Sequence, residues 1–173
     1  QAEAPAPTPS LSRLAREGIR RPPLPRCALS YSHQSHGYGV GSGFTGRVER
    51  PTVNDELCFN LGYEEGTEIR NSFGSSVGCA AGFQDAFRQA MRGEILVIGS
   101  APSQCYHAGY RYGQAYLTVN ARDGRADRVG PACVAAYRRG FQDGKNSYVR
   151  TPPNNYQESA CYLSGYDDSA VFP

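Results

Sequence analysis

Residues 105–116 read CYHAGYRYGQAY, and this stretch bears directly on the fold. It has the character of a helix, yet Gly109 and Gly113 stand four apart inside it. Each glycine costs a helix about 1 kcal/mol relative to alanine. We therefore expect the glycines to serve a close contact between helices, which a larger side chain would obstruct.

Other segments share this design, so the sequence contains an internal repeat. Each copy begins with cysteine, has an aromatic residue four or five positions later and a small residue three positions beyond it. The offset from cysteine to aromatic alternates along the chain, which predicts three tandem units of about 53 residues, each with two related halves. The copies begin at Cys58, Cys79, Cys105, Cys133 and Cys161, and Cys27 begins a degenerate sixth.

One helix plus one loop is the structure predicted for each copy. In the copy that begins at Cys133, the residues Tyr137, Gly140 and Gly144 follow helical spacing and line one face. Only residues 94–98, EILVI, resemble a strand. The predicted fold is mainly α: a small, disulfide-stapled array of short helices built from tandem Cys/Gly-Tyr repeats, with an extended, irregular N-terminal arm.

Three regions are expected along the chain. Residues 1–26 form a flexible arm rich in proline and arginine, and residues 58–173 form the disulfide-linked helical repeat domain. Between them, residues 27–57 are interpreted as a glycine-rich irregular segment. Within it, residues 37–46 (GYGVGSGFTG) are predicted to be a loop or an irregular strand, because glycine is so frequent there.

Small residues at a spacing of four predict where the helices meet. Such a stripe lets two helix backbones approach closely, and we expect an aromatic ring of one helix to lie flat on the glycines of its neighbour. The predicted helix-packing residues are Gly62, Gly66, Gly82, Gly109, Gly113, Gly140 and Gly144, with the aromatic residues Tyr63, Phe83, Tyr110, Tyr137 and Tyr166.

The six cysteines are expected to form disulfides, because their number is even and no Cys-x-x-Cys pair suggests zinc. Each bridge contributes about 2–4 kcal/mol, enough to offset the glycine penalties. Six cysteines allow about 15 pairings. If successive helices run antiparallel, neighbouring cysteines lie at opposite ends, so at least one bridge must cross between the odd and even sets. Cys27, in a loop, is the candidate for that crossing.

The composition excludes some classes of protein. A net charge of +2 is too small to suggest nucleic-acid binding, and no apolar window is long enough to span a membrane. The first residues, QAEAPAPTPS, are those expected just after cleavage of a signal peptide. Together with the cysteines they predict an exported protein, periplasmic or extracellular.

Candidate catalytic and metal sites are few. His33 and His36, spaced i,i+3, could ligate copper or zinc if a third ligand approached. The carboxylates in Glu64–Glu65 and Asp167–Asp168 are interpreted as solvated faces, because adjacent residues point apart on a helix. We assign no catalytic residue, no metal site and no cofactor, and expect the protein not to be an enzyme.

The stretch CYHAGYRY is similar to the active-site segment of the small secreted prokaryotic and fungal phospholipases A2. His107 matches the catalytic histidine of that family, and Gly109 and Tyr110 match its Gly-Tyr. Position 108 is alanine, where the family has the aspartate that helps to bind calcium. The repeated cysteine-bearing helices also look loosely like Sel1-type helical repeat proteins and like small bacterial envelope proteins with Tyr-x-x-Gly repeats.

The function predicted from these features is that of an exported structural protein acting by protein–protein contact, as part of an envelope assembly or filament. Its partners would be other subunits, docked through residues 1–57, whose first 50 residues carry seven arginines against three glutamates. One alternative is a secreted inhibitor or small toxin that presents residues 31–46 or 119–131 as a reactive loop. A phospholipase A2-like hydrolase is the other alternative.

Overall fold

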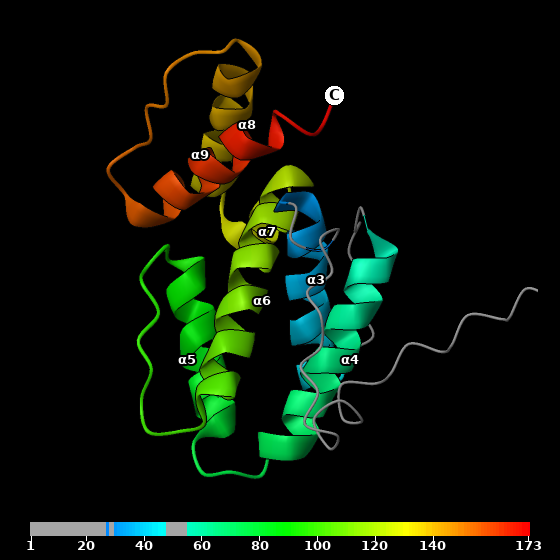
Figure 1. Ribbon diagram of the computed structural model, residues 1–173. Coiled ribbons are helices and arrows are strands. Elements are labelled where there is room, and N and C mark those ends of the chain that lie inside the picture. The colour runs from blue at the N-terminus through cyan, green and yellow to red at the C-terminus, as the bar shows by residue number, and fades with distance from the viewer. Residues whose placement is uncertain (1–26, 28–29, 48–54) are drawn as a thin grey trace, which may run out of the picture.

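The computed structural model describes residue 27 and residues 30–47 and 55–173, and it confirms the mainly α fold. No strand occurs in this part of the chain, and none of its helices is long and apolar enough to cross a membrane. The predicted arm, residues 1–26, lies outside the described residues. The helices are α3 (Ser30–Thr45), α4 (Glu56–Phe73), α5 (Cys79–Met91), α6 (Ser103–Arg122), the short α7 (Ala126–Val129), α8 (Pro131–Lys145) and α9 (Tyr156–Asp168) (Figure 1).

Local sequence sets several of the helix starts. The buried Asp55 caps α4, and its carboxylate accepts a hydrogen bond from the backbone N–H of Cys58 at 3.2 Å. Asn155 caps α9 in the same way, accepting from the N–H of Glu158 at 3.0 Å. Pro131 occupies the first turn of α8, where its missing N–H costs nothing.

Three disulfides join helices that are neighbours in the sequence. The bridges are Cys27–Cys58, Cys79–Cys105 and Cys133–Cys161, with Cα–Cα distances of 5.4–5.6 Å. Four of the cysteines lie in the first turn of their helices, whereas Cys27 precedes α3 and Cys161 is the sixth residue of α9. The two helices of each pair run parallel, because their glycine contacts advance in the same direction along both helices. The three pairs, α3/α4, α5/α6 and α8/α9, are the three tandem units that the repeat predicts.

The expectation that successive helices run antiparallel is wrong within each pair, whereas the expected crossing of Cys27 to the other cysteine set is confirmed by its bridge to Cys58. All three bridges cross between those sets, because the two helices of each pair begin at the same end. Between α5 and α6 the connection returns to that end. The 13 residues of α5 rise about 20 Å, whereas ten extended residues reach about 33 Å. Figure 1 shows the connection from α5 to α6 running back beside α5 before α6 begins.

Glycines bring the backbones of each pair into contact. A Cβ on Gly62 would overlap the carbonyl oxygen of His36, and one on Gly66 would overlap that of Val40. The register advances by four residues on both α3 and α4, as parallel packing requires. Gly140 of α8 meets the carbonyl oxygen of Tyr162 in the same manner.

Aromatic rings occupy only some of the glycine positions, so the predicted ring-on-glycine packing needs correction. Gly82 does face a ring, since its Cβ would lie 2.8 Å from Cε1 of Tyr106. Gly109, in contrast, lies against the backbone carbonyl of Phe83. The glycines therefore mainly allow backbone-to-backbone contact, which leaves no room even for the Cβ of alanine.

The prediction of a loop or irregular strand at residues 37–46 is wrong, because residues 30–45 form α3. Gly39 and Gly43 face α4, where a Cβ would overlap the backbone of that helix. Gly41 faces α6 and lies against the ring of Tyr112. α3 is thus packed between two helices, and this close packing outweighs the low helix propensity of glycine. The prediction of an irregular segment at residues 27–57 is therefore wrong over residues 30–45.

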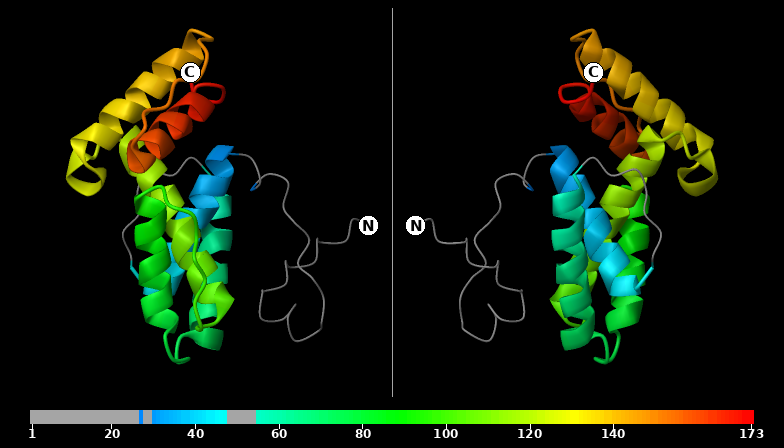
Figure 2. Two further views of the ribbon diagram at one scale, coloured as in Figure 1. Left: turned by 90° about the vertical axis from the view of Figure 1, so that its left-hand side faces the viewer. Right: turned by 90° about the vertical axis from the view of Figure 1, so that its right-hand side faces the viewer.

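The first two pairs form a four-helix bundle in which one pair runs antiparallel to the other (Figures 1 and 2). Phe44, at the end of α3, stacks on Phe83, near the start of α5, with ring centroids 4.2 Å apart. Tyr38 of α3 meets the edge of Tyr112 of α6 at 5.4 Å. The long connections lie within the pairs and a short segment, residues 74–78, joins one pair to the other, which gives the up-up-down-down topology of a helix bundle.

The third pair lies across the C-terminal end of α6 and has a core of its own (Figure 2). Tyr137 and Tyr162 are buried in it, together with Cys133, Cys161 and Leu117 of α6. α6 therefore takes part in both cores and connects the bundle to the third pair.

Two other sequence-based assignments also need correction. Residues 94–98 are extended but pair with no strand, since they form the connection between α5 and α6. Residues 119–131 are not a loop, because most of them belong to the end of α6 and to α7. Buried positions such as Val119 and Val129 hold this segment in place.

Candidate functional site

Residues 94–98, EILVI, form an apolar segment on the outside of the bundle, here called the strap. Ile95 is 86% exposed, Val97 66% and Ile98 46%. Leu96 alone turns inward, where it packs on the small cluster around Ala86. The strap thus presents aliphatic side chains to solvent along an extended backbone.

Hydrogen bonds fix the strap to α5 and α6. The side-chain Oε1 of Gln89 accepts from the N–H of Val97 at 2.8 Å, and its backbone oxygen accepts from the N–H of Glu94 at 2.9 Å. Tyr110 of α6 donates its hydroxyl proton to the carbonyl of Glu94 at 2.7 Å. Burial raises the pKa of Tyr110, so this donor keeps its proton at neutral pH.

Other backbone groups of the strap lack partners. The backbone groups of Ile95, Leu96 and Ile98 make no hydrogen bond with any described residue. An extended backbone with unpaired groups is able to accept a further strand along its edge.

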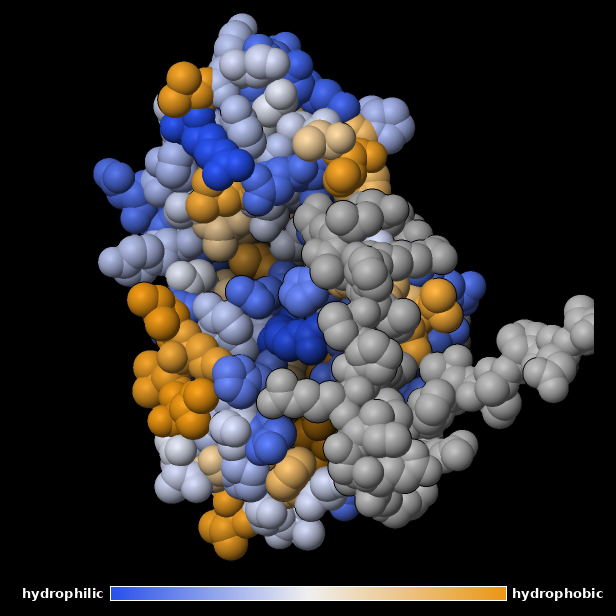
Figure 3. Space-filling model, in the orientation of Figure 1, coloured by the Kyte–Doolittle hydropathy of each residue, from blue (hydrophilic) through white to orange (hydrophobic). Residues whose placement is uncertain are grey.

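The strap forms part of a larger apolar patch. Figure 3 shows a cluster of hydrophobic surface over the connection between α5 and α6. Tyr156, at the start of α9, is 74% exposed. It adjoins the strap, because its carbonyl lies against Gly93. Contiguous apolar patches of this kind mark interaction surfaces.

The predicted helix-packing aromatics occupy different environments. Phe83 and Tyr137 are buried in the two main cores. Tyr110 supports the strap, and Tyr166 donates its hydroxyl proton to the carbonyl of Tyr148 at 2.5 Å. Tyr63 is half-exposed on α4, with its backbone rather than its ring against Gly43.

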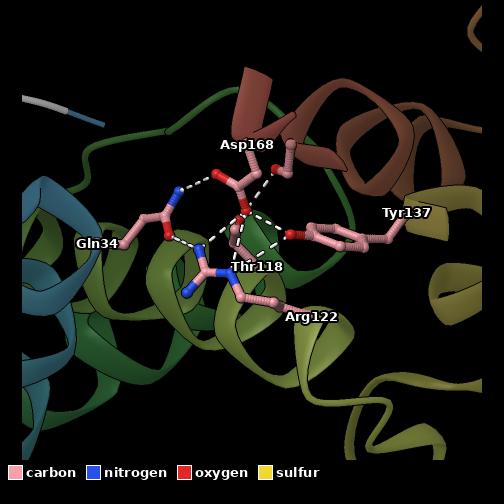
Figure 4. A network of polar contacts seen from close by, with 6 residues as sticks. Gln34, Thr118, Arg122, Tyr137 and Asp168 are labelled. Carbon is pink, nitrogen blue, oxygen red and sulfur yellow. Dashed lines mark hydrogen bonds and ion pairs between the residues drawn. The ribbon is translucent and has the colours of Figure 1, made fainter. Parts of the chain in front are cut away.

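A second feature is the polar network where the third pair meets the bundle (Figure 4). The carboxylate of Asp168 is fully buried, and Arg122 donates to its Oδ2 from Nη2 at 2.9 Å and from Nε at 3.2 Å. Tyr137 donates to the same oxygen at 2.6 Å. Gln34 donates to Oδ1 at 3.2 Å, and its own carbonyl accepts from Arg122.

This network contains residues from all three helix pairs: Gln34 from the first, Arg122 from the second, and Tyr137 and Asp168 from the third. Burial, and then the Asp168 carboxylate, raise the pKa of Tyr137, which keeps its hydroxyl protonated. Because every member lies within hydrogen-bond distance of another and the members come from all three pairs, the network positions the pairs relative to one another.

Sequence reasoning missed this network because the pair Asp167–Asp168 was interpreted as solvated. Asp167 is indeed half-exposed and pairs with Arg150 at 2.9 Å. Asp168, however, continues the buried stripe of Cys161 and Gly165 at helical spacing. That spacing is the signal that separates the two aspartates.

The candidate metal ligands His33 and His36 lie on α3, and side-chain contacts engage both ring nitrogens of His36. Nε2 of His36 lies 3.0 Å from Glu65, and its Nδ1 contacts the guanidinium of Arg111. Both ring nitrogens are therefore engaged. Burial lowers the pKa of Arg111, while Glu65 opposes that shift. The described residues contain no group of three potential ligands that could hold a metal ion.

His107, which matches the phospholipase histidine, is exposed on α6. No described residue forms a hydrogen bond or ion pair with its side chain. Ala108 turns to the core beside it, so the calcium-binding position of that family has no counterpart here.

Comparisons with protein-family models, with curated proteins and with solved structures found no match to this chain.

Proposed function

We propose that this chain is an exported structural protein that acts by contact with other protein subunits, and that the strap is its contact surface. The observation that supports this best is the exposure of Ile95 and Val97 on a backbone held in place by Gln89 and Tyr110. An apolar surface that is fixed rather than free loses little conformational entropy when a partner covers it.

Export is the second part of the proposal. All six cysteines are oxidised in three bridges, and no free thiol remains. Disulfides of this kind persist in the periplasm and outside the cell, where the environment is oxidising. A periplasmic or extracellular location therefore agrees with the chemistry of the fold.

A second copy of the chain is the simplest partner. Two straps paired antiparallel would bring aliphatic side chains opposite each other. The backbone groups of Ile95, Leu96 and Ile98 would gain hydrogen bonds at the same time. Such a two-fold contact needs only one surface per subunit. Docking through residues 1–57 remains a prediction, except that residues 30–45 form α3 and are part of the core.

Size-exclusion chromatography with light scattering tests this function. The oxidised protein should form dimers or larger assemblies at micromolar concentration, and the double variant Ile95→Lys/Val97→Lys should be monomeric. Val149→Lys is the matched control, because Val149 is 83% exposed but lies in the connection between α8 and α9. A wild-type chain that stays monomeric at every concentration would refute self-association through the strap.

The alternative of a secreted inhibitor has less support. Residues 31–46 lie in α3 and in the turn that ends it, and residues 119–131 lie mostly in α6 and α7. Neither segment is presented as a reactive loop.

A further inference from the structure

A pocket of about 490 Å³ opens beside the polar network, and Arg122 and Tyr137 belong to both. It lies between α8 and the segment that follows α9. Small-molecule sites in proteins commonly measure about 300–1,000 Å³, so this pocket has the size of a ligand site. Its lining includes Arg122, Tyr137, Arg138, Phe141, Gln142 and Phe172.

The walls of the pocket are aromatic and are held in place. Phe172 lies under the guanidinium of Arg122, with Cζ 4.5 Å from the ring centroid. Lys145 donates to the carbonyl of Phe172 at 2.5 Å, and its Nζ lies 5.4 Å from the ring centroid of Phe141. These contacts join the segment after α9 to α8 and α6, and both phenyl rings line the pocket.

The two arginines that line the pocket differ in whether a carboxylate pairs with them. The charge of Arg122 is balanced by Asp168. Arg138, in contrast, forms no hydrogen bond or ion pair with any described residue. The amide of Gln142, one turn further along α8, adds a neutral donor next to it. The pocket therefore combines apolar walls with one cation whose charge is not balanced.

We propose that this pocket binds a small amphipathic anion, a ligand with an aromatic or aliphatic body and a carboxylate or sulfonate head. The body lies between Phe141 and Phe172, and the head accepts hydrogen bonds from Arg138 and Gln142. A guanidinium donates two parallel hydrogen bonds to such a head, which makes the contact both strong and oriented. This binding function is independent of contact through the strap.

Two dyes of matched shape test the proposal. Anilinonaphthalene sulfonate carries the aromatic body and the anionic head, and N-phenylnaphthylamine carries the body alone. Fluorescence titration of the oxidised protein should show saturable binding of the sulfonate dye. Arg138→Gln should weaken that binding about tenfold or more, the effect of losing a charge-assisted hydrogen bond, and should change binding of the neutral dye less than twofold.

Arg139→Gln is the matched control, because it removes the same charge from the next position of α8. The guanidinium of Arg139 lies 4.8 Å from the ring centroid of Tyr162 and donates to the carbonyl of Thr151. This variant should bind the sulfonate dye within twofold of wild type. Ile95→Ser/Val97→Ser should do so as well, which separates the pocket from the strap.

Three results would overturn the assignment: no saturable binding of the sulfonate dye, equal losses in Arg138→Gln and Arg139→Gln, or loss of binding when the strap is altered. Arg138 is exposed, so its variant is expected to fold, and circular dichroism of each variant checks this. The proposal for the strap is tested separately, because light scattering measures the mass of the assembly and does not depend on dye binding.

Discussion

The four-helix bundle and the third helix pair are built from the same unit, yet the two pairs of the bundle contact each other in a different way from that in which the third pair contacts the bundle. In the bundle, rings pack on rings, as Phe44 does on Phe83 and Tyr38 on Tyr112. At the third pair, a buried carboxylate gathers Gln34, Arg122 and Tyr137 around it.

This difference shows that the contacts that hold a pair together are not those that arrange the pairs relative to one another. Within every pair, a disulfide bridge and close contacts at glycines hold the two helices together. Between pairs, an apolar contact tolerates small shifts, because dispersion forces have little directional preference. A buried ion pair with hydrogen bonds on all sides fixes one orientation, because an unpaired buried charge is costly.

The largest effect is expected from Asp168→Ala, which removes the centre of the polar junction. Arg122 would be left partly buried without a counter-charge, and stability should fall by about 3–5 kcal/mol. Urea denaturation of the oxidised protein measures this. Asp167→Ala is the matched control: it breaks only the half-exposed pair with Arg150, so a loss below about 1 kcal/mol is expected. Equal losses in the two variants would contradict the importance of the junction.

A smaller change in the free energy of unfolding is expected from a substitution within a pair. The sign of this change shows whether helix propensity or close backbone contact determines the effect of Gly66→Ala. Helix propensity alone predicts that Gly66→Ala stabilises α4 by about 1 kcal/mol. The contact with the carbonyl of Val40 predicts instead a net loss of about 1–3 kcal/mol, because a backbone cannot move aside easily.

Gly82→Ala is the comparison variant, since its Cβ would lie 2.8 Å from the ring of Tyr106, a milder overlap than the 1.9 Å between a Cβ on Gly66 and the carbonyl oxygen of Val40. Its loss should be smaller than that of Gly66→Ala. Thermal denaturation of both variants with intact disulfides gives the order. A stabilised Gly66→Ala variant would show that the backbones are not in close contact.

The smallest expected effect is a pH dependence of the free energy of unfolding. It distinguishes the polar network around Asp168 from the stacked rings of Phe44 and Phe83. The folded-state pKa of Tyr137 is raised above its ordinary value of 10.0. Above that pH the unfolded chain loses this proton while the folded chain keeps it, so the contribution of Tyr137 to stability is present below pH 10 and declines as the pH rises. The stability advantage of wild type over Tyr137→Phe should narrow by about 1 kcal/mol between pH 9 and pH 11.

Measuring the difference between the two proteins removes the titration of the other tyrosines. Phe44→Leu, which alters the ring stack of the bundle, should show a difference from wild type that is constant over the same pH range. An advantage of wild type over Tyr137→Phe that is equally constant would show that the hydroxyl of Tyr137 is not held by Asp168.

The sequence predicted the three helix pairs correctly, but it did not predict how the helices are arranged within them. The alternating offset after each cysteine identified three tandem pairs, because that spacing reports on a local helix face. It did not reveal that the helices of a pair run parallel, since this depends on connections that double back, such as the one between α5 and α6. The helix at residues 37–46 was missed because propensity counts glycine as a cost, whereas contact with α4 and α6 makes it necessary. Asp168 was missed because its neighbour Asp167 has the ordinary solvated environment.

The bridges also set the order in which the thiols can be consumed during synthesis. Each closes a loop between consecutive cysteines, with separations of 31, 26 and 28 residues. A cysteine that emerges from the ribosome or from a translocation channel therefore meets its final partner before a third thiol becomes available. Oxidation in the order of the sequence therefore leads directly to the three observed bridges.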